Sequence, residues 1–303
     1  KPTYRHEVYD AYKAGRVKTD ENLSLQLEKS KEVCSVLNIP IYSKEGFEAD
    51  DMLGTIVEQI KNKDIDTIIA SGDMDTLQLV GGGVQVYTLK KGIHDTVLYN
   101  EEKVKERFGF TPSLLPDFKG LRGDPSDNII GIEGIGEKTA TDLIKEFGGI
   151  DDIYKSLNKG MLEGKVKPRI ISLLKEGEEE ARFSKMLATI RRDAPIKFEI
   201  PNKKWKEGID MMKARRLFAN LEFRNMSQRL EQVIDIDSVK EEQVEENIDE
   251  NLLEETKVAL WVVDSNITDP SQQDIINFTG IKNINKSREI ILNEIKKRNS
   301  EFI

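Results

Sequence analysis

The apolar positions of the first hundred residues alternate between helical stripes and short β-like runs. Residues 67–70 form an apolar, β-branched run, which predicts a strand buried on both faces. An amphipathic helix is predicted before this run, because apolar residues occur with i, i+3, i+4, i+7 spacing at Leu53, Ile56, Val57 and Ile60. A helix followed at this distance by a strand predicts a crossover unit, in which the start of the helix and the end of the strand meet at one edge of a parallel sheet.

The pattern predicts further elements on both sides of this unit. Before it we expect a helix at 23–37 and a short strand at 39–42. After it we expect a helix at 76–80, strands at 84–89 and 97–99, and a turn at Lys91-Gly92 with a surface His94 beside it. Helices are then expected at 137–147, 150–157, 168–174, 178–190, 211–233 with a break near Glu222, 270–278 and 287–295, and one strand at 258–263. These elements predict an α/β fold followed by helices.

The composition places the chain among ordinary globular proteins. It has 303 residues, enough for two domains, of which 38% are hydrophobic and 33% charged. No apolar run approaches the roughly 18 residues that span a bilayer, and nothing at the N-terminus resembles a signal peptide. The single cysteine, Cys34, excludes an internal disulfide and a cysteine-rich zinc site. We therefore expect a cytoplasmic protein without a membrane partner.

The charge is unevenly distributed along the chain. The net charge of −9 argues against a nucleic-acid partner, but residues 231–255 carry 11 Asp or Glu against one Lys, so the other residues together carry about +1. That acidic stretch lacks apolar periodicity, which predicts a linker or a disordered tether. In residues 1–20, Tyr9, Tyr12 and Lys13 share a helical face, which suits a nucleic-acid backbone, although a solvated face explains it more simply.

Seven carboxylates stand out at the start of the predicted helix, after the predicted strand and in the loop at 123–128. They are Glu48, Asp50, Asp51, Asp73, Asp75, Asp124 and Asp127. A solvated turn and compensation of the helix dipole are the structural alternatives. If the carboxylates converge, each close pair repels by a few kcal/mol at an effective dielectric near 20, so they need bound cations. Oxygen-only ligands favour Mg²⁺ or Mn²⁺, and two such ions roughly 4 Å apart can activate a water at a phosphodiester.

A glycine hairpin follows the last of these acids. Gly134 and Gly136 flank Ile135, which can anchor the hairpin while its backbone faces outward. The helix that begins next offers free N–H groups, with Lys138 and Thr139 placed to help hold a phosphate.

One alternative concerns Asp73-Met74-Asp75-Thr76, which resembles the nucleophile motif of haloacid-dehalogenase-type phosphatases. Asp73 would then form an aspartyl-phosphate, with Asp75 as general acid and base. However, that family expects its motif near the start of the domain, and its Gly-Asp-x-x-x-Asp motif is one residue longer than Gly123-Asp124-Pro125-Ser126-Asp127.

Four segments together resemble the 5′ nuclease domains of bacterial DNA polymerase I, members of the flap endonuclease family. They are Gly46-Phe47-Glu48-Ala49-Asp50-Asp51, Ser71-Gly72-Asp73-Met74-Asp75, Gly123-Asp124-Pro125-Ser126-Asp127-Asn128 and Gly134-Ile135-Gly136-Glu137-Lys138-Thr139-Ala140. The resemblance covers about residues 1–230. It implies a PIN-like parallel-sheet nuclease domain at 1–110, an all-α helix-hairpin-helix (H3TH) module at 111–230, an acidic linker at 231–256 and a fragment of a following domain at 257–303, weakly like a degenerate proofreading exonuclease.

The resemblance also implies an activity and its substrates. It predicts Mg²⁺- or Mn²⁺-dependent 5′-3′ exonuclease and flap endonuclease activity in replication and repair, on 5′ flaps, nicked or gapped duplexes and RNA primers. It further predicts a monomer.

Site roles follow from the same resemblance. Glu48, Asp50 and Asp51 would serve a first metal ion, directly or through water, and Asp73, Asp75 and Asp127 a second, with Asp124 in the outer shell or bridging by water. Tyr12, Lys13 and Arg16 match the family's basic segment near the scissile phosphate, where Lys13 would stabilise developing charge. Arg5 and the hairpin would contact DNA, with K⁺ at the hairpin.

The sequence departs from the family at its start. Family members carry two further Asp on strands before the Arg5-His6-Glu7 segment, and this sequence begins after them. We therefore expect a chain truncated at its N-terminus with an incomplete first metal site. A DNA-binding remnant without catalysis is the alternative that this leaves open.

Overall fold

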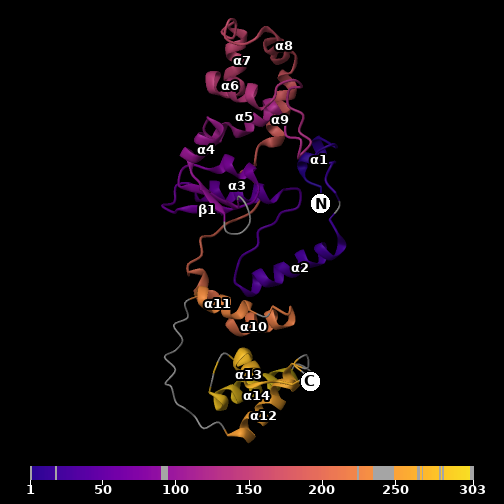
Figure 1. The fold of residues 1–303 in the computed structure, drawn as a ribbon, viewed down its shortest axis with the longest axis vertical. Helices are drawn as coiled ribbons and strands as arrows, with labels where there is room; N and C mark the ends of the chain where they lie inside the picture. Colours follow the sequence, from indigo (N-terminus) through magenta and orange to yellow (C-terminus); the bar gives the residue numbers. More distant parts are fainter. Residues whose placement is uncertain are drawn as a thin grey trace. The chain divides into compact units, whose positions relative to one another are not determined.

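The chain forms two compact units in the computed structural model, which describes residues 2–17, 19–89, 95–223, 225–234, 249–264, 267, 269–279, 281 and 283–300 (Figure 1). The first unit comprises Lys1–Lys18 and Tyr42–Glu199, and the second comprises Thr19–Ile41 and Ile200–Ile303. The turn predicted at Lys91-Gly92, His94 and most of the acidic stretch lie outside the described residues. The domain boundaries drawn from the sequence stay a prediction.

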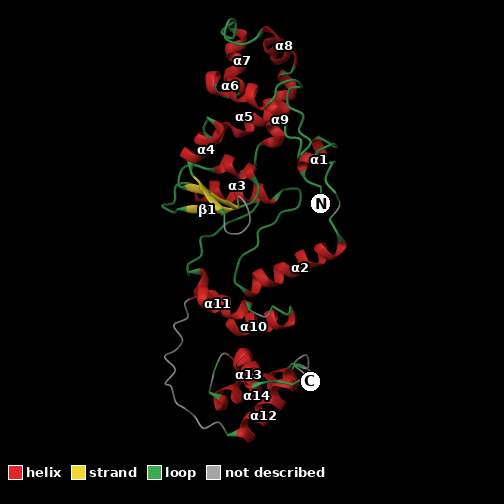
Figure 2. Ribbon diagram, in the orientation of Figure 1, coloured by secondary structure: helices red, strands yellow, loops and turns green. Residues whose placement is uncertain are grey.

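The first unit is built on a small sheet in the order β1-β2-β3, drawn in yellow in Figure 2. β1 (Thr67–Ala70) pairs in parallel with β2 (Val84–Leu89), which pairs antiparallel with β3 (Thr96–Tyr99). The helix expected before β1 is α3 (Ala49–Ile60), so the α/β expectation is confirmed. The expectation that β1 is buried on both faces was wrong. Ile69 is 4% exposed and Ile68 is 61% exposed, because side chains alternate along a strand and the core covers one face.

Short helices lead out of and back into the sheet. A 3₁₀ helix, η1 (Met74–Leu79), follows β1 and begins two residues before the predicted helix. After β3 come α4 (Glu101–Phe108), η2 (Pro112–Leu114) and α5 (Leu115–Arg122). At the N-terminus lies α1 (Tyr4–Val8). The buried side chains of η1, the sheet, α4 and α5 belong to one hydrophobic core.

Four helices extend this core, as the sequence predicts. They are α6 (Glu137–Phe147), α7 (Ile150–Asn158), α8 (Pro168–Glu176) and α9 (Glu178–Ala188). α5 packs closely against α9 at Gly120, where an added Cβ would lie 2.8 Å from the carbonyl oxygen of Ala181. A side chain at this position would therefore push α5 and α9 apart.

The regular elements of the second unit are all helices among its described residues. Its elements are α2 (Glu21–Val36), η3 (Trp205–Gly208), α10 (Met211–Asn220), α11 (Met226–Ile234), α12 (Glu250–Val263), α13 (Gln272–Thr279) and α14 (Ile284–Ser300). α10 and α11 are separated near Glu222, as predicted, where φ is +57°. α12 to α14 share a core of their own.

Two predicted strands are corrected. Residues 258–263 belong to α12, in which Ala259, Leu260 and Val263 are buried at helical spacing. The run was predicted as a strand because a short apolar run is compatible with either a strand or a buried helix. Residues 39–42 form no strand, and Ile39 and Ile41 are 40% and 50% exposed.

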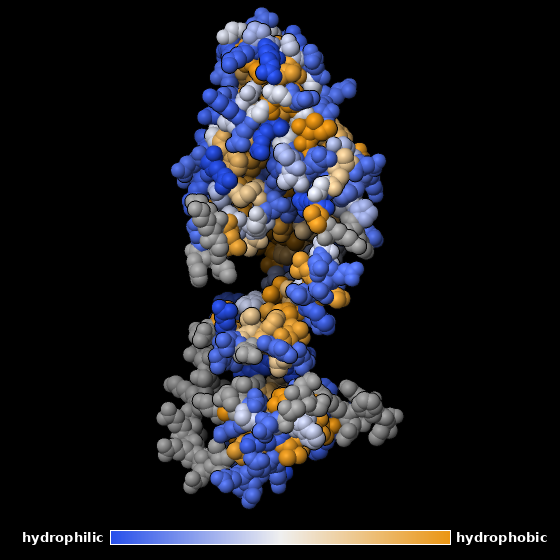
Figure 3. Space-filling view, turned by 45° about the vertical axis from the view of Figure 1, so that its right-hand side comes forward, coloured by the Kyte–Doolittle hydropathy of each residue, from blue (hydrophilic) through white to orange (hydrophobic). Residues whose placement is uncertain are grey.

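The surface drawn in Figure 3 is mainly hydrophilic, with apolar patches interspersed. None of the described helices combines the length and the apolar character that crossing a membrane requires.

Candidate active site

The start of α3 is held by a buried ion pair between Arg5 and Asp51. Nη1 and Nη2 of Arg5 donate to the two oxygens of Asp51 at 2.9 and 3.0 Å, and these oxygens also accept the backbone N–H groups of Glu48 and Arg191. Arg5 further donates to the carbonyl oxygens of Leu187 and Thr189 in and beyond α9. The pair therefore joins three separate segments of the first unit.

These contacts correct two predicted roles. Arg5 is 3% exposed with its guanidinium fully engaged, so it does not lie on a DNA-facing surface. Asp51 is 0% exposed and accepts four hydrogen bonds, which leaves its oxygens no capacity for a metal ion. Both residues position the neighbouring Glu48 instead. Spacing could not reveal this, because an acid at the start of a helix looks the same whether it is solvated, ligating or paired.

Glu48 and Asp127 form an acidic pair that basic side chains of the N-terminal segment neutralise. Nζ of Lys13 lies 2.8 Å from Oε2 of Glu48 and 3.4 Å from Oδ2 of Asp127. Arg16 lies 2.6 Å from Oδ1 of Asp127. The hydroxyl of Tyr12 lies 3.1 Å from Oδ2 of Asp127 and 3.3 Å from Oε2 of Glu48, and its single proton is shared between these two acceptors. Two cations therefore lie opposite two carboxylates here, and the roles predicted for these residues stay predictions.

Tyr12 is buried and does not lie on a face that is open to a nucleic acid. Its side chain is 3% exposed, and its ring packs edge-on against His6. Burial, and then the charges of Glu48 and Asp127, raise the pKa of Tyr12 above its ordinary value, so the hydroxyl stays protonated and donates. Its role here is to hold Glu48 and Asp127 together.

The loop after α5 carries Asp124 and Asp127 in a tight turn. The backbones of Asp124 and Ile129 exchange hydrogen bonds at 2.7 and 2.8 Å, and Asn128 has φ +57°, which Asn tolerates better than most residues. Oδ1 of Asp124 accepts the backbone N–H and the hydroxyl of Ser126. The turn directs Asp127 toward the N-terminal segment, where the N–H of Lys13 donates to the carbonyl oxygen of Asp127 at 3.0 Å.

Four other carboxylates lie near one another with a single lysine. Lys119 of α5 pairs with both Asp75 and Asp124. Burial, followed by repulsion from Asp73, Asp75 and Glu48, raises the pKa of Asp50 to about 6. Asp73 is exposed, and its Oδ1 accepts the N–H of Asp75 at 3.0 Å. The segments that the sequence predicted to meet at one edge of the sheet therefore do interact electrostatically.

The pKa directions within this group follow from burial and from Lys119. Burial raises the pKa of Asp75 even though Lys119 opposes the shift. For Asp124, burial is outweighed by hydrogen bonds from Lys119 and Ser126, which lower its pKa to about 2. Lys119 contacts only Asp75 and Asp124, so the four carboxylates together carry more negative charge than this ammonium neutralises.

The donors can be tested against a divalent metal ion. Oxygen-only donors with excess negative charge are the chemistry that Mg²⁺ and Mn²⁺ require, so the group fits such an ion in composition and charge. Among the described residues, however, no three His, Cys, Asp or Glu side chains are arranged to hold a metal ion. Lys119 in one group and Lys13 with Arg16 in the other lie between the carboxylates in this structure.

The glycine hairpin lies at the start of α6. Gly134 has φ +87°, and Ile135 is 2% exposed within the main core, as the sequence predicted for its side chain. Gly136 precedes α6, and an added Cβ there would meet no heavy atom within 4 Å. Lys138 is exposed and Thr139 partly so. The backbone of this hairpin is therefore open to a ligand, while its apolar residue anchors it.

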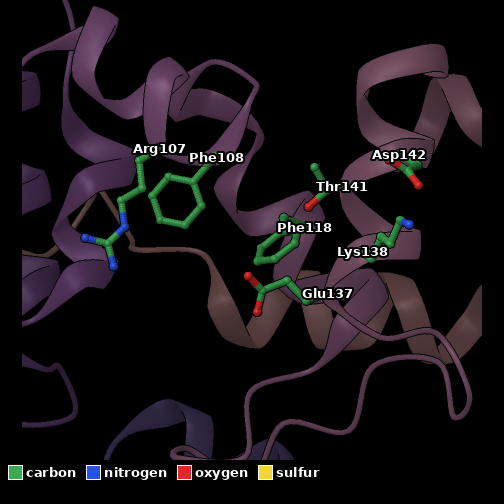
Figure 4. Close-up of a pocket in the computed structure, with 7 residues that line it drawn as sticks. All are labelled: Arg107, Phe108, Phe118, Glu137, Lys138, Thr141 and Asp142. Carbon is green, nitrogen blue, oxygen red and sulfur yellow. The ribbon is translucent and has the colours of Figure 1, made fainter.

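A pocket of about 430 Å³ lies on the solvent side of the same helix, between α4, α5 and α6 (Figure 4). Its lining comprises Arg107, Phe108, Phe118, Glu137, Lys138, Thr141 and Asp142. Lys138, one of the residues predicted to contact DNA, is thus part of a concave surface.

Comparison with known proteins identifies the family of the chain. Residues 1–109 match the model of the 5′-3′ exonuclease N-terminal resolvase-like domain, and residues 110–210 match that of the 5′-3′ exonuclease C-terminal SAM fold. The chain belongs to the 5′-3′ exonuclease family. This assignment argues against the haloacid-dehalogenase alternative, because both matches include the acidic segments that had suggested it.

The curated relatives of this 5′-3′ exonuclease chain are much longer proteins. It is 38% identical to DNA polymerase I of Bacillus caldotenax over 231 residues, which is 76% of this chain and 26% of that protein. It is 42% identical to DNA polymerase I of Chloroflexus aurantiacus over 201 residues, which is 65% of this chain and 21% of that protein. The chain thus spans about a quarter of the length of the relatives it matches.

A solved structure supports the same fold. A T5 5′-exonuclease with bound divalent metal ions (zinc) aligns with a TM-score of 0.53 at 23% sequence identity, covering 77% of this chain and 79% of that one. At this identity the likeness concerns the fold, in which a resolvase-like α/β part precedes helices.

Proposed function

We propose that this chain is a divalent-metal-dependent 5′-3′ exonuclease and 5′ flap endonuclease that acts on DNA. The observation that carries the proposal is the group of four carboxylates, Asp50, Asp73, Asp75 and Asp124, with one lysine among them. Family membership and the open hairpin at Gly136 support it. The proposed setting is replication and repair in the cytoplasm, as part of a DNA polymerase I.

The carboxylates would hold Mg²⁺ or Mn²⁺. Asp50, Asp73, Asp75 and Asp124 are the proposed ligands, and Glu48 with Asp127 would complete a second position once Lys13 and Arg16 turn to the substrate. Bound metal would supply an activated water and a counter-charge to the phosphodiester. Asp51 takes no part as a ligand and acts through Arg5 and Glu48.

The remaining residues would bind and orient the nucleic acid. Lys13 has its ammonium at the carboxylates and 17% of its side chain exposed, so it can meet a phosphate beside them. Arg16 is more open, at 56%. The N–H groups at Gly136 and the start of α6, with Lys138 and Thr139, would hold a phosphate of the duplex, with K⁺ as a proposed companion. The proposed substrates are 5′ flaps, nicked or gapped duplexes and RNA primers, and the proposed state is a monomer.

One observation favours a second candidate, a DNA-binding protein without catalysis. Among the described side chains no three acids are arranged as metal ligands, and Lys13 and Arg16 already neutralise Glu48 and Asp127. Such a protein would bind flap DNA in Ca²⁺ and leave it intact in Mg²⁺ and Mn²⁺.

The test uses a labelled 5′-flap duplex with the parent chain, Asp73→Asn and Asp66→Asn. Asp66 is an exposed acid just before β1 and serves as the matched control. We expect Mg²⁺-dependent cutting near the junction by the parent and by Asp66→Asn, and binding without cutting by Asp73→Asn. Cutting that survives EDTA, or equal cutting by the two variants, would contradict the proposal. Binding without cutting by all three would favour the second candidate.

A further inference from the structure

Lys119 contacts two carboxylates of the acidic group, although no motif of the sequence includes it. It projects from the last turn of α5, five residues before Asp124, and its ammonium contacts Oδ1 of Asp75 and, at 2.5 Å, Oδ2 of Asp124. The three side chains are only 15%, 22% and 13% exposed. One lysine thus joins the segment after β1 to the loop after α5.

Each of the two carboxylates contacts this ammonium through one oxygen. Oδ1 of Asp124 is engaged by the N–H and the hydroxyl of Ser126, which leaves Oδ2 for Lys119. Asp75 is fixed through its own N–H, which donates to Asp73 at the start of η1. Without a cation between them, Asp75 and Asp124 would be two poorly solvated carboxylates close enough to contact the same ammonium, and they would repel each other.

We propose that Lys119 is a positioning residue that occupies the place of a divalent cation between Asp75 and Asp124 and yields it when the cation binds. The inference rests on the proposed metal site and adds a residue to it. While the metal is absent, Lys119 keeps the two ligands near each other. When the metal binds, two positive charges replace one between the same oxygens, so the ammonium has to turn away. Lys119 therefore stabilises the metal-free fold and weakens metal binding at the same time.

A second lysine in the same unit provides a matched control. Lys185 of α9 pairs with the buried Asp117 at 2.7 Å, and Asp117 lies on α5 two residues before Lys119. Asp117 also accepts the N–H of Ile150 and has no part in the acidic group. Replacing Lys185 by Met thus removes a comparable lysine–aspartate pair without touching the proposed metal ligands.

The experiment measures Mn²⁺ binding by electron paramagnetic resonance and thermal unfolding with and without Mn²⁺. Lys119→Met should bind Mn²⁺ at least roughly tenfold more tightly than the parent, because a competing positive charge is gone. Its metal-free Tm should fall, and Mn²⁺ should restore it. Lys185→Met should also lose Tm, but its Mn²⁺ affinity should equal that of the parent and Mn²⁺ should not restore the loss. Lys119→Arg, which keeps the charge, should bind Mn²⁺ within about twofold of the parent.

Two results would overturn the proposal. Equal or weaker Mn²⁺ binding by Lys119→Met would show that Lys119 does not compete with the cation. A parent chain that binds no Mn²⁺ would instead remove the proposed metal site itself, and with it this inference. Lys119→Gln is measured in parallel and gives the same comparison if the Met variant does not fold.

Discussion

Replacing Arg5 by Met tests whether the pair with Asp51 supports the fold or whether Arg5 serves DNA binding. The change removes the hydrogen bonds that Arg5 donates to Asp51, Leu187 and Thr189 and leaves a fully buried carboxylate without its counter-charge. Breaking a buried ion pair from one side typically costs about 3–5 kcal/mol. Since 1 kcal/mol corresponds to about 2–4 °C in a domain of 150–250 residues, Tm of the first unit should fall by about 6–20 °C.

Calorimetry and DNA titrations at several salt concentrations separate the two roles. We expect the large loss in Tm together with an unchanged dependence of DNA affinity on salt, because Arg5 neutralises Asp51 rather than a phosphate. The double variant Arg5→Met/Asp51→Leu should recover part of the loss, since the orphaned charge is then removed as well. A small change in Tm together with a shallower salt dependence of DNA affinity would refute the structural role and show that Arg5 contacts DNA.

Three further predictions address the hairpin, the acidic group and the last helices. Gly136→Val should leave Tm within about 2 °C, because an added Cβ meets no atom there, but should weaken duplex binding and flatten its salt dependence; equal slopes in filter-binding titrations would contradict this. The pKa of Asp50 is raised to about 6 in the folded, metal-free protein. Protonation of Asp50 therefore stabilises this fold fully below about pH 4, and the stabilisation is lost as the pH rises through 6. Asp50→Asn should therefore raise the metal-free Tm relative to the parent at pH 7 but not at pH 4, as melts at both values can check. Leu260→Ala should cost the α12–α14 core about 2–5 kcal/mol and leave the melting of the first unit unchanged in calorimetry, whereas a joint shift would show that the cores unfold together.

The sequence predicted the elements well wherever a periodic pattern was long or bounded by glycine. α6 and α7 meet at Gly148-Gly149 as expected, and β2 spans the predicted residues. The strand predicted at 258–263 was wrong, because a six-residue apolar run does not distinguish a strand from one and a half turns of a buried helix. The prediction that β1 is buried on both faces was also wrong. How many faces of a sheet are covered depends on tertiary packing, which a four-residue run does not encode.

The sequence pointed to the acids of the candidate site and to Lys13 and Arg16, but not to Lys119, which contacts Asp75 and Asp124. Spacing and order led to Asp50, Asp73, Asp75 and Asp124, because acids after a strand and at the start of a helix converge whenever the sheet forms. Lys119 carries no such signal: a lysine in the last turn of a helix is common for its favourable interaction with the helix dipole. Only the packing of α5 brings it between Asp75 and Asp124.

Three of the four basic partners of the acids, Arg5, Lys119 and Arg16, differ in how much of each side chain is exposed. Arg5 is buried and donates to two carbonyl oxygens besides Asp51, so we expect it to keep its place when a metal ion binds. Lys119 is mostly buried, but the two groups that it contacts, Asp75 and Asp124, are carboxylates that a metal ion could take over. Arg16 is 56% exposed and holds Asp127 by one contact. A metal ion and a phosphate entering together would therefore displace Arg16 and Lys119 and leave Arg5 in place, which makes the order of release a property of burial rather than of charge.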